Sequence, residues 1–206
     1  MKRLVTLLLA LAAAAPGLAF AQQLSWNDLR PPQQVESDGK IEVLEFFWYG
    51  CIHCYNLEPV IEKWEKNRPA DVRFRRVPAV FDSGGRTQRD ATYYYAFEAL
   101  GVLDKLHRPF FDAIHRERLR LDNADAMNEW LQKNGVDPKK FNETLKSFGV
   151  QSKLRRAQQM TVAYRIEGTP TMAVHGRYTI AAENARTPEG MFKTVDHLVE
   201  TVRKQK

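Results

Sequence analysis

One stretch decides the fold, because in it a hydrophobic run leads directly into a pair of cysteines: Val43-Leu44-Glu45-Phe46-Phe47-Trp48-Tyr49-Gly50-Cys51-Ile52-His53-Cys54. Residues 41–48 are rich in β-branched and aromatic side chains and are almost continuously apolar, which predicts a strand covered on both faces. Apolar residues then recur at helical spacing, at Leu57, Val60, Ile61 and Trp64. The two thiols are therefore expected where a buried strand ends and a helix begins.

The first 21 residues have the features of a signal peptide. Lys2 and Arg3 form a positive start, residues 4–15 an apolar core, and Ala19-Phe20-Ala21 a cleavage site with small residues at its ends. Cleavage before Gln22 would release the chain into a compartment in which disulfides form, and a bacterial periplasm fits best. An uncleaved anchor is the alternative, although the apolar run is short for a membrane span.

Cys51 and Cys54 are the only cysteines of the 206-residue chain. A disulfide between them would close almost no loop, so it would add little stability, whereas a redox-active pair commonly has this spacing. Zinc is the alternative, but it needs two more ligands, and none of the other four histidines is paired at metal-ligand spacing. We therefore expect no metal and no cofactor.

The overall charge gives no sign of a nucleic-acid partner. The formal net charge is +6, which becomes +4 without Lys2 and Arg3, and the basic residues are spread along the chain. No nucleic-acid-binding motif accompanies them. The contents of hydrophobic (44%) and charged (27%) residues are ordinary for a globular protein.

The expected elements follow an order that predicts the fold class. Strands are predicted at 41–48, 71–77, 172–174 and 178–180, and helices at 51–67 and from Thr187 onward. Between them, 86–167 is helical throughout, with helices at 87–100, 102–118, 123–134, 137–149 and 151–165. Without this block the order is β-α-β then β-β-α, which is that of a thioredoxin fold. We expect a signal peptide (1–21), a thioredoxin-like domain in two parts (22–85 and 168–206) and a helical insertion (86–167).

Residues 43–55 resemble the active-site strand and helix of the DsbA family of bacterial periplasmic thiol:disulfide interchange proteins. Gly168-Thr169-Pro170-Thr171-Met172 resembles the cis-proline loop of that family, and the helices of 86–167 lie where it carries its insertion. The resemblance implies an α/β protein, a thioredoxin fold interrupted by an inserted all-helical domain. It also implies an oxidoreductase that donates the Cys51–Cys54 disulfide to reduced, newly exported polypeptides.

The same resemblance implies reoxidation by a membrane quinone reductase of the DsbB type, and we expect a monomer. The chain departs from the family at the dipeptide between the cysteines, which is Ile52-His53 here and usually Pro-His. That dipeptide tunes the redox potential in this superfamily. Pro59, inside the helix, is more like the kinked helix of thioredoxin itself.

The residues of the pair are expected to have distinct roles. Cys51 lies at the helix start, where unpaired N–H groups and the helix dipole favour a thiolate, so it is the predicted nucleophile. Cys54, one turn further and more buried, is the resolving thiol. His53 is expected to direct an N–H or a positive charge at the Cys51 sulfur.

Other residues are expected to support this chemistry. Glu45 resembles the buried acid beneath the active site of the family, which can relay a proton to Cys54, and Arg76 is its expected partner. Glu42, near the strand start, is expected to reach water. The Thr169–Pro170 peptide is expected to be cis and to leave the Thr169 backbone free for a substrate chain. An apolar surface for unfolded substrates is expected from Trp48, Tyr49, Ile52, Pro170 and Met172.

Two other functions remain open at this point. One is a dithiol reductase or isomerase of the same fold, although residues 22–40 are too few for the separate dimerisation domain of an isomerase. The other is a chaperone-like protein that binds unfolded exported chains and whose cysteines are incidental. His107, His115, His175 and His197 are interpreted as surface or structural residues.

Overall fold

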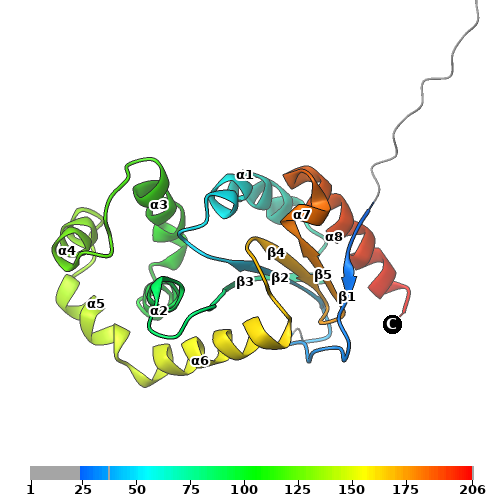
Figure 1. The fold of residues 1–206 in the computed structure, drawn as a ribbon, viewed down its shortest axis with the longest axis horizontal. Coiled ribbons are helices and arrows are strands. Elements are labelled where there is room, and N and C mark those ends of the chain that lie inside the picture. The colour runs from blue at the N-terminus through cyan, green and yellow to red at the C-terminus, as the bar shows by residue number, and fades with distance from the viewer. Residues whose placement is uncertain (1–23, 37, 206) are drawn as a thin grey trace, which may run out of the picture.

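The computed structural model describes residues 24–36 and 38–205, so the expected signal peptide lies outside the described residues. Five strands form one sheet in the order β1-β5-β4-β2-β3 (Figure 1). Strand β2 pairs in parallel with β3 and antiparallel with β4. The strands are β1 (Asn27–Asp28), β2 (Ile41–Phe47), β3 (Val72–Pro78), β4 (Thr171–Val174) and β5 (Tyr178–Ala181).

Strand β2 is central and buried along its whole length, as its apolar run predicted. Because successive side chains of a strand alternate between faces, Val43 packs toward α1 (Ile52–Asn67) and α8 (Pro188–Arg203). Phe46 packs on the other face, toward α2 (Arg86–Ala99) and α6 (Phe148–Ala163). Two layers of helices therefore enclose the strand that leads to Cys51 (Figure 1).

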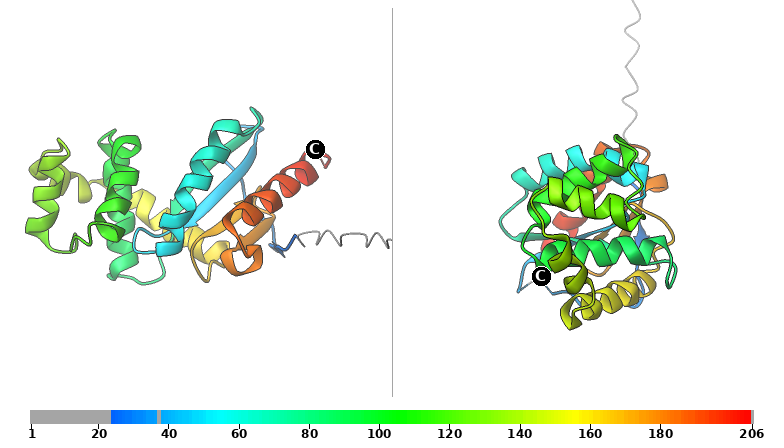
Figure 2. Two further views of the ribbon diagram at one scale, coloured as in Figure 1. Left: turned by 90° about the horizontal axis from the view of Figure 1, so that it is seen from above. Right: turned by 90° about the vertical axis from the view of Figure 1, so that its left-hand side faces the viewer.

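The helices between β3 and β4 form one end of the molecule, and this end has its own hydrophobic core. Helices α3 (Leu103–His115), α4 (Ala124–Lys133) and α5 (Pro138–Leu145) gather beyond the sheet edge, and α6 runs back along the sheet (Figure 2). The core of this end is aromatic, with Phe97 contacting Phe110, Trp130 and Phe141 at ring-centroid distances of 5.4, 6.1 and 5.4 Å. The expected thioredoxin fold with an all-helical insertion is confirmed.

Several helix boundaries have the caps that the sequence predicted. The Asp137 carboxylate accepts the N–H of Lys139, and Pro138 occupies the first helical position of α5. Gly135 follows α4 with a φ of 76°, a left-handed conformation that glycine adopts at no steric cost. Pro59 lies inside α1 as expected.

Other expectations were wrong. One helix was expected over 137–149, but α5 ends at Leu145 and Ser147 caps a new helix, in which Phe148 is 82% exposed. Glu42 does not reach water, because it is buried and binds Arg75 at 2.7 Å.

Two short elements were not predicted. Strand β1 has two residues, and α7 (Ala182–Ala185) has four, so neither is long enough to give a hydrophobic period. Strand β1 pairs with β5, and the neighbouring Leu29 is buried. Within the described residues, no helix has both the length and the apolar character that a membrane span requires.

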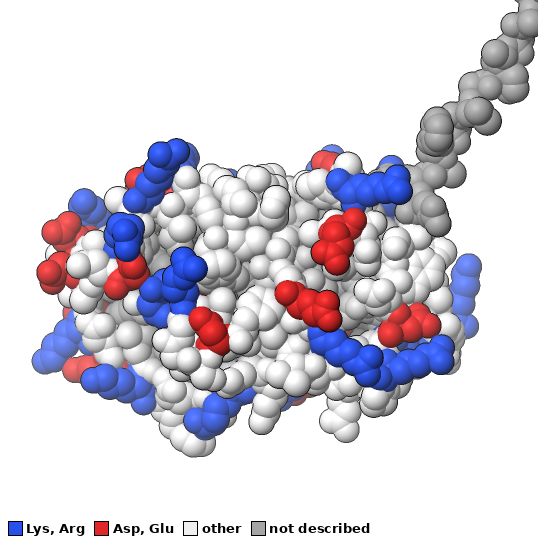
Figure 3. Space-filling view, viewed as in Figure 1, with Lys and Arg blue, Asp and Glu red and all other residues white. Residues whose placement is uncertain are grey.

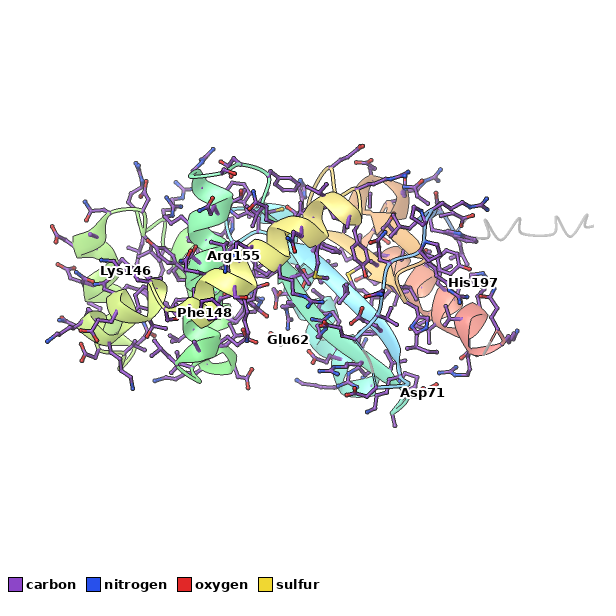
Figure 4. All side chains as sticks on the ribbon, turned by 90° about the horizontal axis from the view of Figure 1, so that it is seen from below. Glu62, Asp71, Lys146, Phe148, Arg155 and His197 are labelled. Atoms are coloured by element: carbon purple, nitrogen blue, oxygen red, sulfur yellow. The ribbon has the colours of Figure 1, made fainter. Side chains whose placement is uncertain are left out.

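Truncating a side chain in the aromatic core of the insertion should cause a large loss of stability. Phe97→Ala should lower the free energy of unfolding by about 3–5 kcal/mol, because Phe97 is fully buried among other rings. Phe148→Ala is the matched control and should change it by less than about 0.5 kcal/mol, because the ring lies in solvent (Figure 4). Urea unfolding followed by circular dichroism measures both, and equal losses would contradict the assigned core.

Candidate active site

The two cysteines lie at the junction between β2 and α1. Cys51 is the N-cap of α1 with an extended backbone, and its N–H donates to the Trp48 carbonyl at 2.9 Å, which closes the turn after β2. The N–H of Cys54 donates to the Cys51 sulfur at 3.4 Å. Both cysteines are free thiols, so the structure is that of the reduced protein. Cys51 retains 9% of its surface and Cys54 retains none, so only Cys51 can meet a substrate.

The environment of Cys51 favours the thiolate. Its pKa is lowered from 9.0 to about 5. The hydrogen bond from the Cys54 side chain is the largest cause and outweighs the opposing effect of burial. The Thr169 side chain and the N–H groups of Cys54 and His53 lower the pKa further. Burial, by contrast, raises the pKa of Cys54 well above its usual range. The pair therefore combines one ionised sulfur with one protonated sulfur at neutral pH.

His53 lies in the first turn of α1 with its imidazole exposed, and its backbone N–H is one of the groups that lower the pKa of Cys51. Ile52 is 46% exposed, so the residue that departs from the Pro-His of the family is an apolar side chain on the surface beside Cys51.

The Thr169–Pro170 loop lies against the nucleophile. The peptide is cis, as the resemblance implied, and the Thr169 carbonyl accepts the Cys51 thiol at 3.2 Å. Pro170 is buried and Thr169 is partly exposed. This loop leads into β4, which pairs with β2, so strand pairing brings residues 118 positions apart to the same site.

Glu45 is a buried carboxyl group under the site. It is fully buried, and Arg76 Nε lies 3.2 Å from its Oε2, although neither carboxyl oxygen has a hydrogen-bond partner among the described residues. Burial raises its pKa to about 8; the charge of Glu58 adds to this effect, and Arg76 opposes it. Glu45 can therefore both hold and release a proton near neutral pH. The expected Glu45–Arg76 pair is present.

Sequence reasoning missed two members of this buried cluster. Glu58 Oε2 accepts Arg76 Nη2 at 3.2 Å, and its Oε1 lies 3.3 Å from His107 Nε2. The other ring nitrogen of His107 lies 2.9 Å from the Tyr49 hydroxyl. Burial opposes ionisation of Glu58, but its bonds to His107 and Arg76 lower its pKa below the usual value. A glutamate one helical turn after Cys54, on the buried face of α1, was the available signal.

Three residues expected on the substrate surface, Tyr49, Pro170 and Met172, are buried, whereas Trp48 is partly exposed. Tyr49 is 1% exposed and packs edge-on against Phe110 and Phe111 at 4.6 and 4.9 Å, so it belongs to the core of the insertion. Met172 is fully buried because its position on β4 faces α8. Trp48 is partly exposed, and its Nε1 donates to Asp90 on α2 at 2.7 Å. Neither Tyr49 nor Met172 can contact a substrate directly.

The surface around the cysteines has few charges. Figure 3 shows an uncharged area over the first turns of α1, whereas basic and acidic side chains both occur over the helical insertion. In the part of the chain that the structure describes, no group of three or more His, Cys, Asp or Glu could hold a metal ion. The chemistry that this arrangement supports is thiol–disulfide exchange at Cys51.

Comparison with known proteins agrees with this chemistry. Residues 42–190 match the model of the DSBA-like thioredoxin domain family. The thiol:disulfide interchange protein DsbA of Pseudomonas aeruginosa is 37% identical over 97% of this chain and 96% of its own length. That of Bordetella pertussis is 42% identical over 97% and 92%.

Solved structures are similar as well. The crystal structure of Pseudomonas aeruginosa DsbA has a TM-score of 0.81 at 39% identity, covering 87% of this chain and 93% of the other. The oxidoreductase NmDsbA1 of Neisseria meningitidis has a TM-score of 0.73 at 30% identity, covering 87% and 92%. The family match spans both parts of the sheet and the inserted helices. The chain therefore belongs to the DsbA family and is a thiol:disulfide oxidoreductase.

Proposed function

We propose that this oxidoreductase acts as a dithiol oxidase, which passes its Cys51–Cys54 disulfide to reduced, newly exported polypeptides. The observation that carries the proposal is the pKa of Cys51, lowered to about 5 beside a buried Cys54 whose pKa is raised. A disulfide whose reduced form is stabilised as a thiolate is a stronger oxidant. The opposite direction, reduction, would need a dithiol that gains little from ionisation.

The pKa of Cys51 sets the size of the effect on the reduction potential. At pH 7, about two units above the pKa of Cys51, ionisation stabilises the reduced form by at most about 2.7 kcal/mol, before solvent screening. For a two-electron couple this equals about 60 mV. The stabilisation is present at neutral pH and is lost as the pH falls through about 5. It covers part of the roughly 150 mV by which the reduction potentials of thioredoxin and DsbA differ.

Each step of the exchange then has a group to serve it. A substrate thiolate attacks the Cys51 sulfur of the oxidised enzyme, and the bond to Cys54 breaks. The released Cys54 thiolate is buried, so it takes a proton, which Glu45 supplies. A second substrate thiolate then attacks the substrate sulfur of the mixed disulfide, which forms the substrate disulfide, and Cys51 leaves as a thiolate. The backbone N–H of His53 helps to stabilise the Cys51 thiolate that leaves.

Exposed groups around Cys51 support a broad choice of polypeptide substrates. Ile52 offers apolar surface, and the edge of the partly exposed Trp48 extends it. The backbone of Thr169, already within hydrogen-bond distance of Cys51, can pair with an extended chain that carries the reacting cysteine. Such contacts are independent of the sequence of the substrate.

The cellular setting that we propose is supported by the family and by the first residues. A periplasmic location after removal of 1–21, and reoxidation by a membrane quinone reductase of the DsbB type, complete the cycle of a dithiol oxidase. A monomer is supported by the N-terminal arm, which adds β1 to the sheet of its own chain and buries Leu29. The division into 22–85, 86–167 and 168–206 is proposed with it, since α2 to α6 occupy the middle segment.

Turnover separates this function from passive binding. Cys51→Ser should abolish oxidation of a reduced, unfolded disulfide protein, because the Cys51–Cys54 disulfide that accepts the two electrons can no longer form. Any slowing of aggregation of that protein should be the same for the variant and the wild type, because apolar binding does not need the Cys51 sulfur. Oxidation by Cys51→Ser at the wild-type rate would overturn the proposal.

The pKa of Cys51 is predicted to depend on its neighbour. In the reduced protein, the rate at which iodoacetamide alkylates Cys51 should increase with pH, with a midpoint at about pH 5. Cys54→Ala should move the midpoint upward because the largest cause of the shift is lost, whereas Cys54→Ser keeps a hydrogen-bond donor and should move it less. A wild-type midpoint near 9 would contradict the assigned environment.

The proton role of Glu45 can be tested at the buried sulfur. Glu45→Gln should slow closure of the Cys51–Cys54 disulfide from a mixed disulfide at pH 7 by about 10- to 100-fold, because Cys54 then lacks a base. Glu42→Gln on the same strand is the control, since Glu42 points to the other face and pairs with Arg75. Rapid-quench measurement of closure that is equally fast in Glu45→Gln and wild type would remove the role.

A further inference from the structure

A basic hollow lies directly beside the cysteines, on the side of the helical insertion. Trp48 and Gly50 form the wall nearest to Cys51, and the cavity has a volume of about 550 Å³. Four arginines line it, two from the start of α2 and two from the segment after α3: Arg86, Arg89, Arg118 and Arg120. The exchange mechanism uses none of these arginines.

Two of the four arginines are neutralised within the hollow itself. Arg89 binds the Asp90 carboxylate at 2.8 Å, and that carboxylate also accepts the Trp48 indole N–H. Arg120 binds Asp122 at 3.1 Å. These two carboxylates are the acidic groups that line the hollow, and each is already paired.

The other two arginines have no such partner. Neither Arg86 nor Arg118 forms an ion pair with a carboxylate of residues 24–36 or 38–205, and the four arginines outnumber the two aspartates of the lining, so the hollow carries a net positive charge. The Arg86 guanidinium lies 5.6 Å from the Trp48 ring centroid, a cation–π distance, which holds it at the wall next to Cys51. Arg118 is exposed, and its φ of 57° is a conformation that non-glycine residues rarely adopt outside functional sites or turns.

The floor of the hollow is apolar. Phe110 and Leu121 are buried there, and Leu119 at the edge keeps 40% of its surface exposed. A guanidinium presents a planar fork of N–H donors that matches a carboxylate, and the surface beneath it suits methylene groups. A side chain with an aliphatic stem and a carboxylate end, that of glutamate above all, fits both properties.

We propose that this hollow is a subsite for an acidic side chain of the polypeptide whose cysteine reacts at Cys51, with Arg86 and Arg118 as the specificity-determining residues. The inference rests on the proposed function, because it needs a polypeptide thiol at Cys51. Gly50, in the wall, is the residue before Cys51, and an extended chain advances about 3.3–3.6 Å per residue. The carboxylate therefore belongs within a few residues of the reacting cysteine.

The test compares two synthetic dithiol peptides that are identical except for three residues beside the first cysteine, which are Glu in one and Gln in the other. Single-turnover oxidation by the oxidised full chain is followed at low ionic strength. The Glu peptide should react about 10-fold faster than the Gln peptide, and 0.5 M salt should reduce this ratio to about 2 or less.

Variants separate the hollow from the overall charge of the protein. The double variant Arg86→Ala/Arg118→Ala should lower the Glu-to-Gln ratio to about 2 or less. The matched control, Lys146→Ala/Arg155→Ala, removes the same net charge from exposed residues on α6 and the turn before it (Figure 4), across the sheet from α1 (Figure 1). It should keep the wild-type ratio.

The outcomes distinguish failure of the acidic subsite from failure of the proposed oxidase function. Equal rates for the two peptides in wild type, or a ratio that survives in Arg86→Ala/Arg118→Ala, would overturn the acidic subsite alone. A ratio that falls equally in both double variants would overturn it too, because general attraction would then explain the preference. Failure of the wild type to oxidise either peptide would instead contradict the proposed oxidase.

Discussion

The account depends on the placement of one sulfur at the start of a helix, above a second sulfur that is buried. Cys51 caps α1, so its sulfur receives the N–H of Cys54 at 3.4 Å while the Thr169 loop closes over it. Cys54 lies one turn below, without solvent contact. The pair is therefore unequal: reduction creates a stable thiolate at one position and a neutral thiol at the other. That inequality gives the direction of exchange and decides which cysteine a substrate meets.

The rest of the fold holds this junction in place. Strand β2 is buried on both faces and fixes the turn that precedes Cys51, and its pairing with β4 brings Thr169 to the sulfur. The helical insertion supports the same turn from the side, through Tyr49 in its aromatic core and Trp48 bound to Asp90. Beneath it, Glu45, Glu58 and Arg76 form a charged cluster, in which a single guanidinium lies between two carboxyl groups. Because burial opposes its ionisation and the charge of Glu58 adds to that effect, which Arg76 offsets only in part, Glu45 keeps a proton near neutral pH.

The sequence predicted the parts of this arrangement that depend on local pattern. The apolar run of β2, the helical spacing after Cys54 and the Asp137-Pro138 cap each have a local signal, and each is present. The expected partner of Glu45, Arg76, is also in place. Other features that depend on distant partners were not accessible in this way. Glu42 was expected in water because it lies near the start of the strand, but its partner, Arg75, lies on another strand.

The remaining misses share that cause. Tyr49 was expected to face substrate, since nothing near it in the sequence announces the rings of α3 that enclose it. His107 has no distinguishing neighbours in the chain, yet it completes the cluster at Glu58. The hollow with Arg86 and Arg118 joins two segments about 30 residues apart, so only the folded chain brings these charges together. The backbone N–H of His53 lowers the pKa of Cys51, and the role of its ring stays a prediction.

The pH dependence of the reduction potential tests the central claim most directly. Equilibrium of the Cys51–Cys54 pair with glutathione, followed by tryptophan fluorescence from pH 4 to pH 8, gives that dependence. If Cys51 is ionised above pH 5 and Cys54 stays protonated, the potential should fall by about 59 mV per pH unit below that point and by about 30 mV per unit above it. A slope of about 59 mV per unit up to pH 8 would mean that both thiols hold their protons, and the account would be wrong.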